Sequence, residues 1–149
     1  MIVRSTMPCP KELAANLREI SVFEIEKLVG DKEKVIAAAL KRAAHVWTGS
    51  IEDRLIFACG VESSTIISDT AYLWILTTKL VDEHTFVFIR WSKLFIEELS
   101  LIYPNIHGYV HSDYKKSVVW LKWLGFTISP PDEKEPRIRR FSMERSWTP

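Results

Sequence analysis

A glutamate and two tyrosines are the residues of this chain best suited to moving a proton during catalysis. Glu62 ends an expected strand over 54–62, and a carboxylate at a strand end can act as a general base. Tyr114, or alternatively Tyr109, carries a hydroxyl that can act as the general acid. The alternative is that Glu62 is a solvated strand-end carboxylate and that the tyrosines pack at a rim, since acid–base catalysis needs a mutual geometry that spacing does not provide.

The histidines and cysteines do not form a metal-binding pattern. His107 and His111 share one face of an expected strand, but four positions along a strand span about 13 Å, which is too far for one metal ion. Cys9 and Cys59 are far apart and belong to no CxxC group, so neither a zinc site nor a disulfide framework is expected. We therefore expect no metal site and a reducing compartment.

Two tryptophans in the segment "KSVVWLKWLGF" (116–126) lie on different sides of an expected helix. Successive residues turn by about 100°, so one broad face is apolar and the opposite face carries Val119 and Trp123 next to Lys116. Exposed aromatic side chains rimmed by lysines are typical anchors of protein interfaces. Lys116, Val119 and Trp123 therefore form a candidate partner-binding surface. The alternative is that the final loop or the C-terminal "SWTP" covers Trp123.

The first third of the chain is expected to be mostly helical. A short strand over residues 2–7 precedes two prolines, and a periodic apolar pattern then predicts a helix over 11–20. Ser21 and Glu24 form a capping-box pattern for a helix that ends at Gly30. Asp31 is the expected N-cap of the next helix, which runs to about residue 44 and has basic residues in its last turn.

The remainder alternates between strands and helices. A hairpin is expected over 45–62 with its turn at 50–53, followed by a central strand over 71–78 that is apolar at nearly every position. An amphipathic helix over 85–102 should cover the sheet with its core stripe; this stripe contains Phe88, Trp91, Phe95, Ile96, Leu99 and Ile102. A strand over 106–112, a helix capped by Ser112 or Asp113 and ended by Gly125, and strands over 127–129 and 137–144 complete an α/β sandwich.

Composition and charge limit the classes of function. The chain has 149 residues, of which 47% are hydrophobic and 26% charged, so one domain over 1–149 with a sizeable core is expected. A net charge of +1 provides no strong field for gathering nucleic acid or anionic membrane. Arg137 and Arg139, with Lys134, are expected either to protect a solvated edge strand or to meet phosphate or an acidic partner. No apolar run is long enough to span a bilayer, and the first residues lack a signal-peptide pattern, so no export by that route is expected.

The order of elements, together with the ending "WLKWLGF" before a last pair of strands, resembles the GNAT family of acyl-CoA-dependent N-acyltransferases. Within that superfamily, "AYLWILTT", "FIRWSKLFIEELSLIYPNIHGYV" and "SVVWLKWLGF" look most like small GNAT-like proteins of podophages, including internal virion proteins. The resemblance implies a central, mixed and mostly antiparallel sheet of about six to seven strands flanked by helices. It also implies a location in the host cytoplasm or the virion.

In GNAT enzymes, the coenzyme A diphosphate lies against a glycine-rich loop between the central strand and the long helix. Small residues there allow several backbone N–H groups to converge on the phosphates. The segment 77–86 contains no glycine and carries Asp82 and Glu83, each of which would oppose a diphosphate by about 1 to 4 kcal/mol. If coenzyme A binds, the resemblance implies a site made by Ile75, Leu76, Thr77, Thr78, Lys79, His84 and Thr85. Thr85 can alternatively be read as the N-cap of the long helix.

A second departure concerns the proton donor. GNAT enzymes carry a tyrosine four residues before the glycine that ends the last helix, and here that position is Leu121, which cannot donate a proton. Both departures concern residues that bind the cofactor or transfer a proton, and neither changes the residues that form the fold. The sequence therefore favours a catalytically degenerate GNAT-fold protein without a cofactor, acting through contacts with a viral or host protein. The alternative is an active N-acetyltransferase that uses acetyl-CoA through a divergent diphosphate loop.

Overall fold

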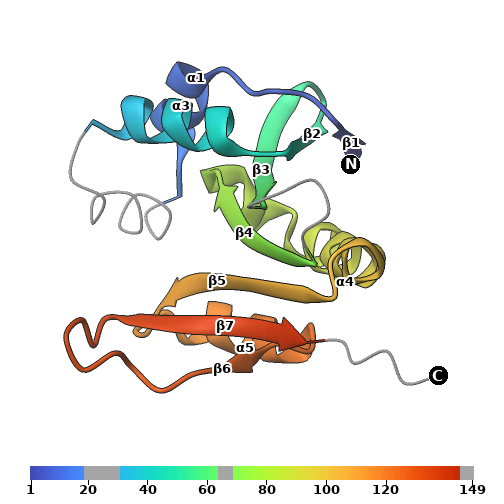
Figure 1. Cartoon of the computed structure of the whole chain (residues 1–149). Helices are drawn as coiled ribbons and strands as arrows, with labels where there is room; N and C mark the ends of the chain where they lie inside the picture. The colour runs from blue at the N-terminus through green and yellow to red at the C-terminus, as the bar shows by residue number, and fades with distance from the viewer. Residues whose placement is uncertain (19–30, 64–68, 145–149) are drawn as a thin grey trace. The chain divides into compact units, whose positions relative to one another are not determined.

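The computed structural model describes residues 1–18, 31–63 and 69–144, and in these residues the chain forms a seven-stranded sheet with the order β1-β2-β3-β4-β5-β7-β6 (Figure 1). The strands are β1 (Ile2–Arg4), β2 (His45–Ile51), β3 (Arg54–Glu62), β4 (Thr70–Thr77), β5 (Asn105–His111), β6 (Thr127–Ile128) and β7 (Ile138–Glu144). The helices are α1 (Pro10–Asn16), α3 (Lys32–Arg42), α4 (Thr85–Ile102) and α5 (Lys115–Trp123), with a 3₁₀ turn η1 (Lys79–Glu83). The predicted mixed α/β fold is confirmed. The helix predicted over 21–30 lies outside the described residues.

The sheet combines antiparallel pairs with one parallel pair. β4 pairs in parallel with β5 at Thr70–Tyr72, and α4 lies between the two strands in the sequence, which confirms the expected central strand and crossover helix. The chain divides into two compact units: unit 1 is Met1–Glu62 with Trp74–Val87, and unit 2 is Ser63–Leu73 with Phe88–Pro149.

Local sequence signals account for the N-terminal elements of unit 1. The carboxylate of Asp31 accepts the backbone N–H of Glu33 at 3.0 Å, so this residue is the N-cap of α3, as predicted. The β2–β3 hairpin turns through Glu52 and Asp53, whose φ angles of 52° and 59° are those of a turn matched to the twist of the two strands.

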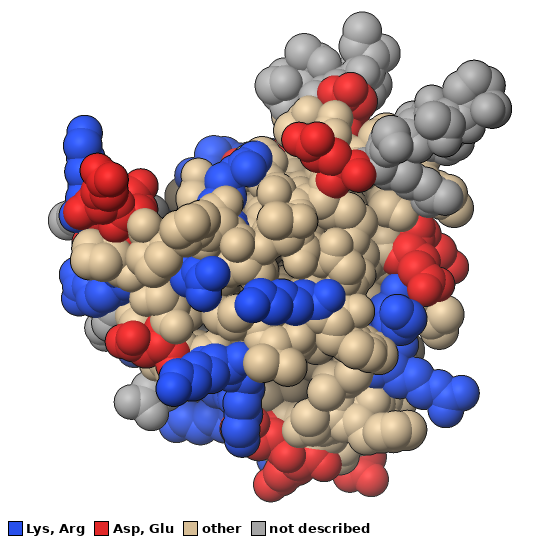
Figure 2. Space-filling model, turned by 90° about the horizontal axis from the view of Figure 1, so that it is seen from below, with Lys and Arg blue, Asp and Glu red and all other residues tan. Residues whose placement is uncertain are grey.

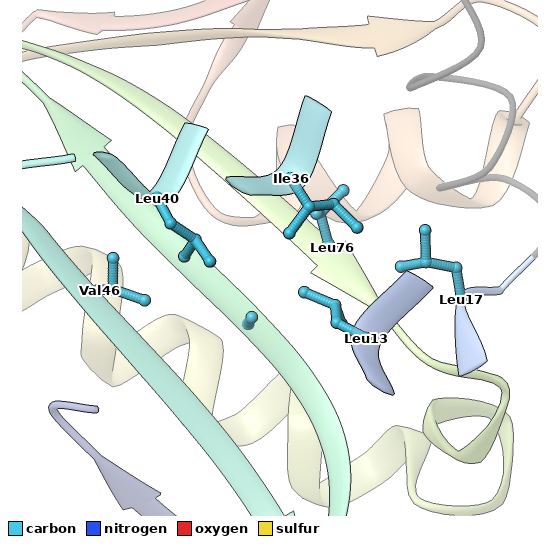
Figure 3. Packing of buried hydrophobic residues seen from close by; sticks show 7 residues of the cluster. Leu13, Leu17, Ile36, Leu40, Val46 and Leu76 are labelled. Atoms are coloured by element: carbon cyan, nitrogen blue, oxygen red, sulfur yellow. The ribbon is translucent and has the colours of Figure 1, made fainter. Parts of the chain in front are cut away.

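The hydrophobic core of unit 1 lies between these helices and the sheet (Figure 3). Leu13 and Ile36 are at most 1% exposed and bring α1 and α3 together over the strands. The cluster consists of Leu13, Leu17, Ile36, Leu40, Val46, Ala58 and Leu76. Each large aliphatic side chain buried in this way stabilises the fold by about 1.5 to 3 kcal/mol relative to an exposed one.

In unit 2, α4 and α5 contact each other through an aromatic layer. The indole N–H of Trp120 donates to the hydroxyl of Ser92 at 3.1 Å, and the ring of Phe88 lies 5.6 Å from that of Trp120. Ile102, which was predicted to be in the core stripe of α4, is instead 66% exposed. It is the last residue of the helix, so it lies at the end of the stripe, where fewer neighbours cover it.

The two ends of α5 differ in how well local sequence predicts them. Gly125 has a φ of 105° and follows the helix, and the N–H of Phe126 donates back to the carbonyl of Leu121 at 3.1 Å, so the predicted glycine terminus is confirmed. The predicted cap by Ser112 or Asp113 is wrong, because Tyr114 occupies the N-cap position and makes no side-chain capping bond. The Ser112 hydroxyl donates instead to the carbonyl of Pro136 at 2.9 Å.

Candidate functional site

The turn between β4 and α4 is fixed at its first residues by hydrogen bonds. The N–H of Thr78 donates to the carbonyl of Ile56 at 2.9 Å, and its hydroxyl donates to the carbonyl of Leu55 at 2.7 Å. The carbonyl of Thr77 accepts the N–H of Arg18 at 2.8 Å. Thr77 and Thr78 are both buried. These two of the predicted diphosphate-binding residues therefore fix the turn to the rest of unit 1.

The middle of the turn is a 3₁₀ helix that uses part of its own hydrogen-bonding capacity. The N–H of Val81 donates to the carbonyl of Thr78, and the N–H of His84 donates to the carbonyl of Val81, both at 3.1 Å. Among the described residues, positive φ angles occur at Glu52, Asp53 and Gly125 and not in this turn. The turn therefore has a conformation that needs no glycine, and two of its amides are already engaged.

An ion pair with a residue outside the turn makes the turn less negative than its own sequence predicts. A guanidinium nitrogen of Arg18 lies 3.2 Å from a carboxylate oxygen of Asp82, so the negative charge of Asp82 is partly offset. Glu83 and Lys79 are exposed, and His84 is half-buried. The electrostatic opposition to a diphosphate therefore depends mainly on Glu83. Arg18 was not among the predicted site residues, because it is distant in sequence and only the fold brings it to the turn.

The first turn of α4 is open to solvent. The hydroxyl of Thr85 donates backwards to the carbonyls of Val81 and Asp82 at 3.2 Å, so the prediction that Thr85 caps the helix is wrong. Phe86 is 75% exposed and Val87 39% exposed. The first N–H groups of a helix have no partner within the helix, and together with the positive end of the helix dipole they favour an anion.

The predicted proton-transfer residues lie in different units. Glu62 belongs to unit 1, where one of its carboxylate oxygens is 3.3 Å from the guanidinium of Arg42. Tyr114 belongs to unit 2, where its ring packs edge-on against His111 with 5.0 Å between the centroids. Leu121, which stands where GNAT enzymes carry a tyrosine, is 3% exposed. The catalytic roles of Glu62 and Tyr114 remain predictions.

The outer surface of α5 in unit 2 is exposed, as helical arithmetic predicts. Val119 is 66% exposed and Trp123 50% exposed, and Lys116 is exposed beside them. The ammonium of Lys93, on α4, lies 4.7 Å from the centre of the Trp123 ring, which is a cation–π distance. Periodicity within one helix could not identify Lys93, since it comes from the neighbouring helix. That this surface binds a protein remains a prediction.

Other candidate groups have structural explanations. Burial raises the pKa of the Cys59 thiol, so this side chain is a poor nucleophile. Arg137 pairs with Glu135 at 2.9 Å, and Arg139 donates to the carbonyl of Ser129 at 2.8 Å. Figure 2 shows acidic and basic side chains interspersed on the face that it views. In the part of the chain that the structure describes, no three metal-ligating side chains cluster and no helix is long and apolar enough to cross a bilayer.

No protein-family profile matches the chain, and no curated protein matches its sequence. Solved structures do match. An aminoglycoside 6′-acetyltransferase type Ii has a TM-score of 0.73 at 14% identity, and the match covers 100% of both chains. An acetyltransferase from Bacillus subtilis in complex with CoA has a TM-score of 0.67 at 13% identity, covering 97% of this chain and 98% of that one. A chimera of the spermidine N-acetyltransferase SpeG from Vibrio cholerae and hSSAT has a TM-score of 0.68 at 13% identity, covering 96% of this chain and 94% of that one. The chain therefore has the fold of the GNAT acetyltransferases.

Proposed function

We propose that the chain is an acyl-CoA-dependent N-acyltransferase in which the open start of α4 replaces the glycine-rich diphosphate loop. The observation that supports this proposal is the first turn of α4, where Phe86 and Val87 are exposed and the hydroxyl of Thr85 donates backwards to the carbonyls of Val81 and Asp82. The Bacillus subtilis neighbour, which binds CoA on the same fold, supports it. The Arg18–Asp82 ion pair removes part of the electrostatic objection that the sequence raises.

The residues of the turn would hold the diphosphate end of the acyl-CoA. The N–H groups of Phe86 and Val87 would donate to phosphate oxygens, and Lys79 would add a positive charge next to them. Arg18 would keep Asp82 paired and away from the phosphates. The bound thioester supplies the acyl group that is transferred to an amine. Glu62 would accept a proton from that amine, and the CoA thiolate that leaves would take up a proton, which Leu121 cannot supply.

The amide of Phe86 offers a sharp test, because proline lacks the N–H and is tolerated in the first turn of a helix. Phe86→Pro should weaken the binding of CoA about tenfold, the effect of losing one hydrogen bond to a charged group. Phe86→Ala is the matched control, since it keeps the N–H and removes only an exposed side chain; it should bind CoA within about twofold of the unmodified chain. Isothermal titration calorimetry measures the affinity, and circular dichroism verifies that both variants fold.

Two results would contradict the proposal. One is the absence of any heat of binding or rise in melting temperature with CoA at millimolar concentration. The other is an equal loss of affinity in Phe86→Pro and Phe86→Ala, which would place the diphosphate elsewhere. A transfer assay with acetyl-CoA and a panel of primary amines then separates binding from catalysis.

A second candidate function rests on the exposed tryptophan of α5. In it, the chain is catalytically degenerate and acts through contacts of Lys116, Val119 and Trp123 with a viral or host protein. A half-exposed indole beside lysines supports it, as do the two turn amides that are already engaged and the buried Leu121. Trp123→Ala should abolish partner capture while lowering stability by less than about 1 kcal/mol, whereas a larger loss of stability would place the indole in the core. Lys134→Ala, at another exposed lysine, is the control.

A further inference from the structure

One face of the β4–β5–β7 sheet in unit 2 gathers aromatic and cationic side chains that the proposed function leaves unused. Tyr72 of β4 is directly opposite His107 of β5, and Tyr109 of β5 is directly opposite Arg140 of β7. Directly opposite residues project to the same side of a sheet, and residues two apart on one strand do so as well. These four residues therefore form one row across three strands, which we call the Tyr109 face.

The opposite side of the same strands is the buried one. Ile106 and Val110 alternate with His107 and Tyr109 along β5 and are 1% and 4% exposed, and Phe141 of β7 is 5% exposed. Tyr109, by contrast, is 52% exposed. An aromatic side chain this exposed contributes little to the core, so packing alone does not explain the Tyr109 face.

The aromatic rings of the Tyr109 face contact each other. The ring of Tyr72 lies 5.6 Å from that of His107 and 6.1 Å from that of Tyr109, and both pairs are tilted by 49°. These are normal distances for interacting aromatic rings. The contacts hold the Tyr109 ring in place and leave part of it open, so a flat ring could stack on it.

The arginine of the Tyr109 face differs from the two arginines that precede it in the sequence. Arg137 is paired with Glu135, and Arg139 is bound to the carbonyl of Ser129. Arg140 is exposed, and none of the described carboxylates lies within ion-pair distance of it. A guanidinium that the protein itself leaves uncompensated is suited to binding a carboxylate or a phosphate through two hydrogen bonds.

The histidine adds hydrogen-bonding capacity. Nδ1 of His107 is buried and has no hydrogen-bond partner among the described residues. Burial and, secondly, the nearby charge of Arg140 lower the pKa of His107, so this ring is neutral near pH 7 and Arg140 is the cation of the row.

We propose that the Tyr109 face binds a small ligand made of a planar ring that carries an anionic group, with the ring stacked on Tyr109 and the anionic group at Arg140. Aromatic carboxylates and nucleoside monophosphates share this chemistry. A single-stranded nucleic acid fits less well, because it needs a run of cations along its backbone and the net charge of the chain is only +1.

Two-dimensional ¹H–¹⁵N NMR tests the proposal with 4-hydroxybenzoate and uridine 5′-monophosphate as probes. Each should shift the amide resonances of Tyr109 and Arg140 with at least tenfold higher affinity than uridine, which lacks the charge, or inorganic phosphate, which lacks the ring. The probe that binds more tightly shows whether the face prefers a carboxylate or a phosphate as the anionic group. Arg140→Gln should reduce the affinity for uridine 5′-monophosphate to that for uridine, and Tyr109→Leu should weaken both probes. Arg137→Gln is the matched control and should change neither affinity.

Several outcomes would overturn the proposal. These are no shift at Tyr109 and Arg140 with either probe at millimolar concentration, an unchanged affinity in Arg140→Gln, or a tighter and salt-sensitive response to an oligothymidylate. Shifts of the same resonances on dilution of the protein alone would mean that a second copy covers the face, and would overturn it too. The titration of the unmodified chain tests ligand binding at the Tyr109 face even if a variant does not fold.

Coenzyme A should instead shift the amide resonances of residues 79–87. The two proposals can therefore fail independently of each other.

Discussion

A single ion pair decides how strongly the turn before α4 opposes an anion. Asp82 is held by Arg18 at 3.2 Å, whereas Glu83 forms no ion pair with a described residue. Glu83→Gln should therefore strengthen CoA binding about two- to fivefold, the size of an exposed charge effect. Arg18→Gln should weaken it by a similar factor, because it releases the charge of Asp82. Calorimetry at low and high salt measures both, since screening should shrink both effects.

The control for these two substitutions is Glu133→Gln, which removes an exposed carboxylate in unit 2. It should leave the affinity for CoA unchanged. If Glu83→Gln behaves like this control, the diphosphate does not lie near the turn and the electrostatic argument fails.

The titration of His107 tests how burial and charge act on this ring. Burial and then the charge of Arg140 lower its pKa from the ordinary value of 6.5, so its ring should titrate below that value in an NMR experiment. Between the two pKa values, the unfolded chain binds a proton that the folded chain does not. His107 therefore lowers the free energy of unfolding as the pH falls through 6.5. Arg140→Gln should raise the pKa of His107 only part of the way back to 6.5, since burial is the larger cause of the shift. A ring that titrates above 6.5 would contradict this account.

At the scale of elements, the end of α5 depends on the backbone of Gly125. Its φ of 105° lies in a region that other residues rarely adopt, and a Cβ atom there would come 3.3 Å from the terminal methyl of Met143, which can move. Backbone strain is thus the main cost, and Gly125→Ala should lower the free energy of unfolding by about 1 kcal/mol or more. Urea denaturation measures it. Lys122→Ala, an exposed change in the same helix, should alter stability by less than about 0.5 kcal/mol.

Elements whose signals are local could be predicted from the sequence. The bounds of α4 are those that periodicity predicts, and Asp31 and Gly125 mark helix ends because capping and positive φ are set by nearby residues. The start of α5 could not be predicted, because the Ser112 hydroxyl finds the carbonyl of Pro136, which only the fold brings near. The same holds for Arg18 at the turn and for Lys93 over Trp123.

At the scale of the whole chain, fold and activity are separate conclusions. The match to an aminoglycoside acetyltransferase covers 100% of both chains at only 14% identity, so the scaffold is shared while most side chains differ. One scaffold carries many chemistries, and the residues at the site decide among them. The start of α4 and the surface around Trp123 therefore have to be tested separately, as the two candidate functions require.

The nearly neutral net charge of the chain predicts weak binding of nucleic acid. Twenty Lys and Arg residues are balanced by nineteen Asp and Glu residues, and Figure 2 shows both signs interspersed on the face it views. Nucleic-acid binding depends on releasing counterions through a cluster of cations, and proteins that have one bind non-specifically with dissociation constants of about 10⁻⁴ to 10⁻⁶ M. We therefore expect duplex DNA and single-stranded RNA to bind more weakly than about 10⁻⁴ M at physiological salt in fluorescence anisotropy. Micromolar binding that weakens steeply with salt would contradict this, and would mean that a local cluster of cations outweighs the neutral whole.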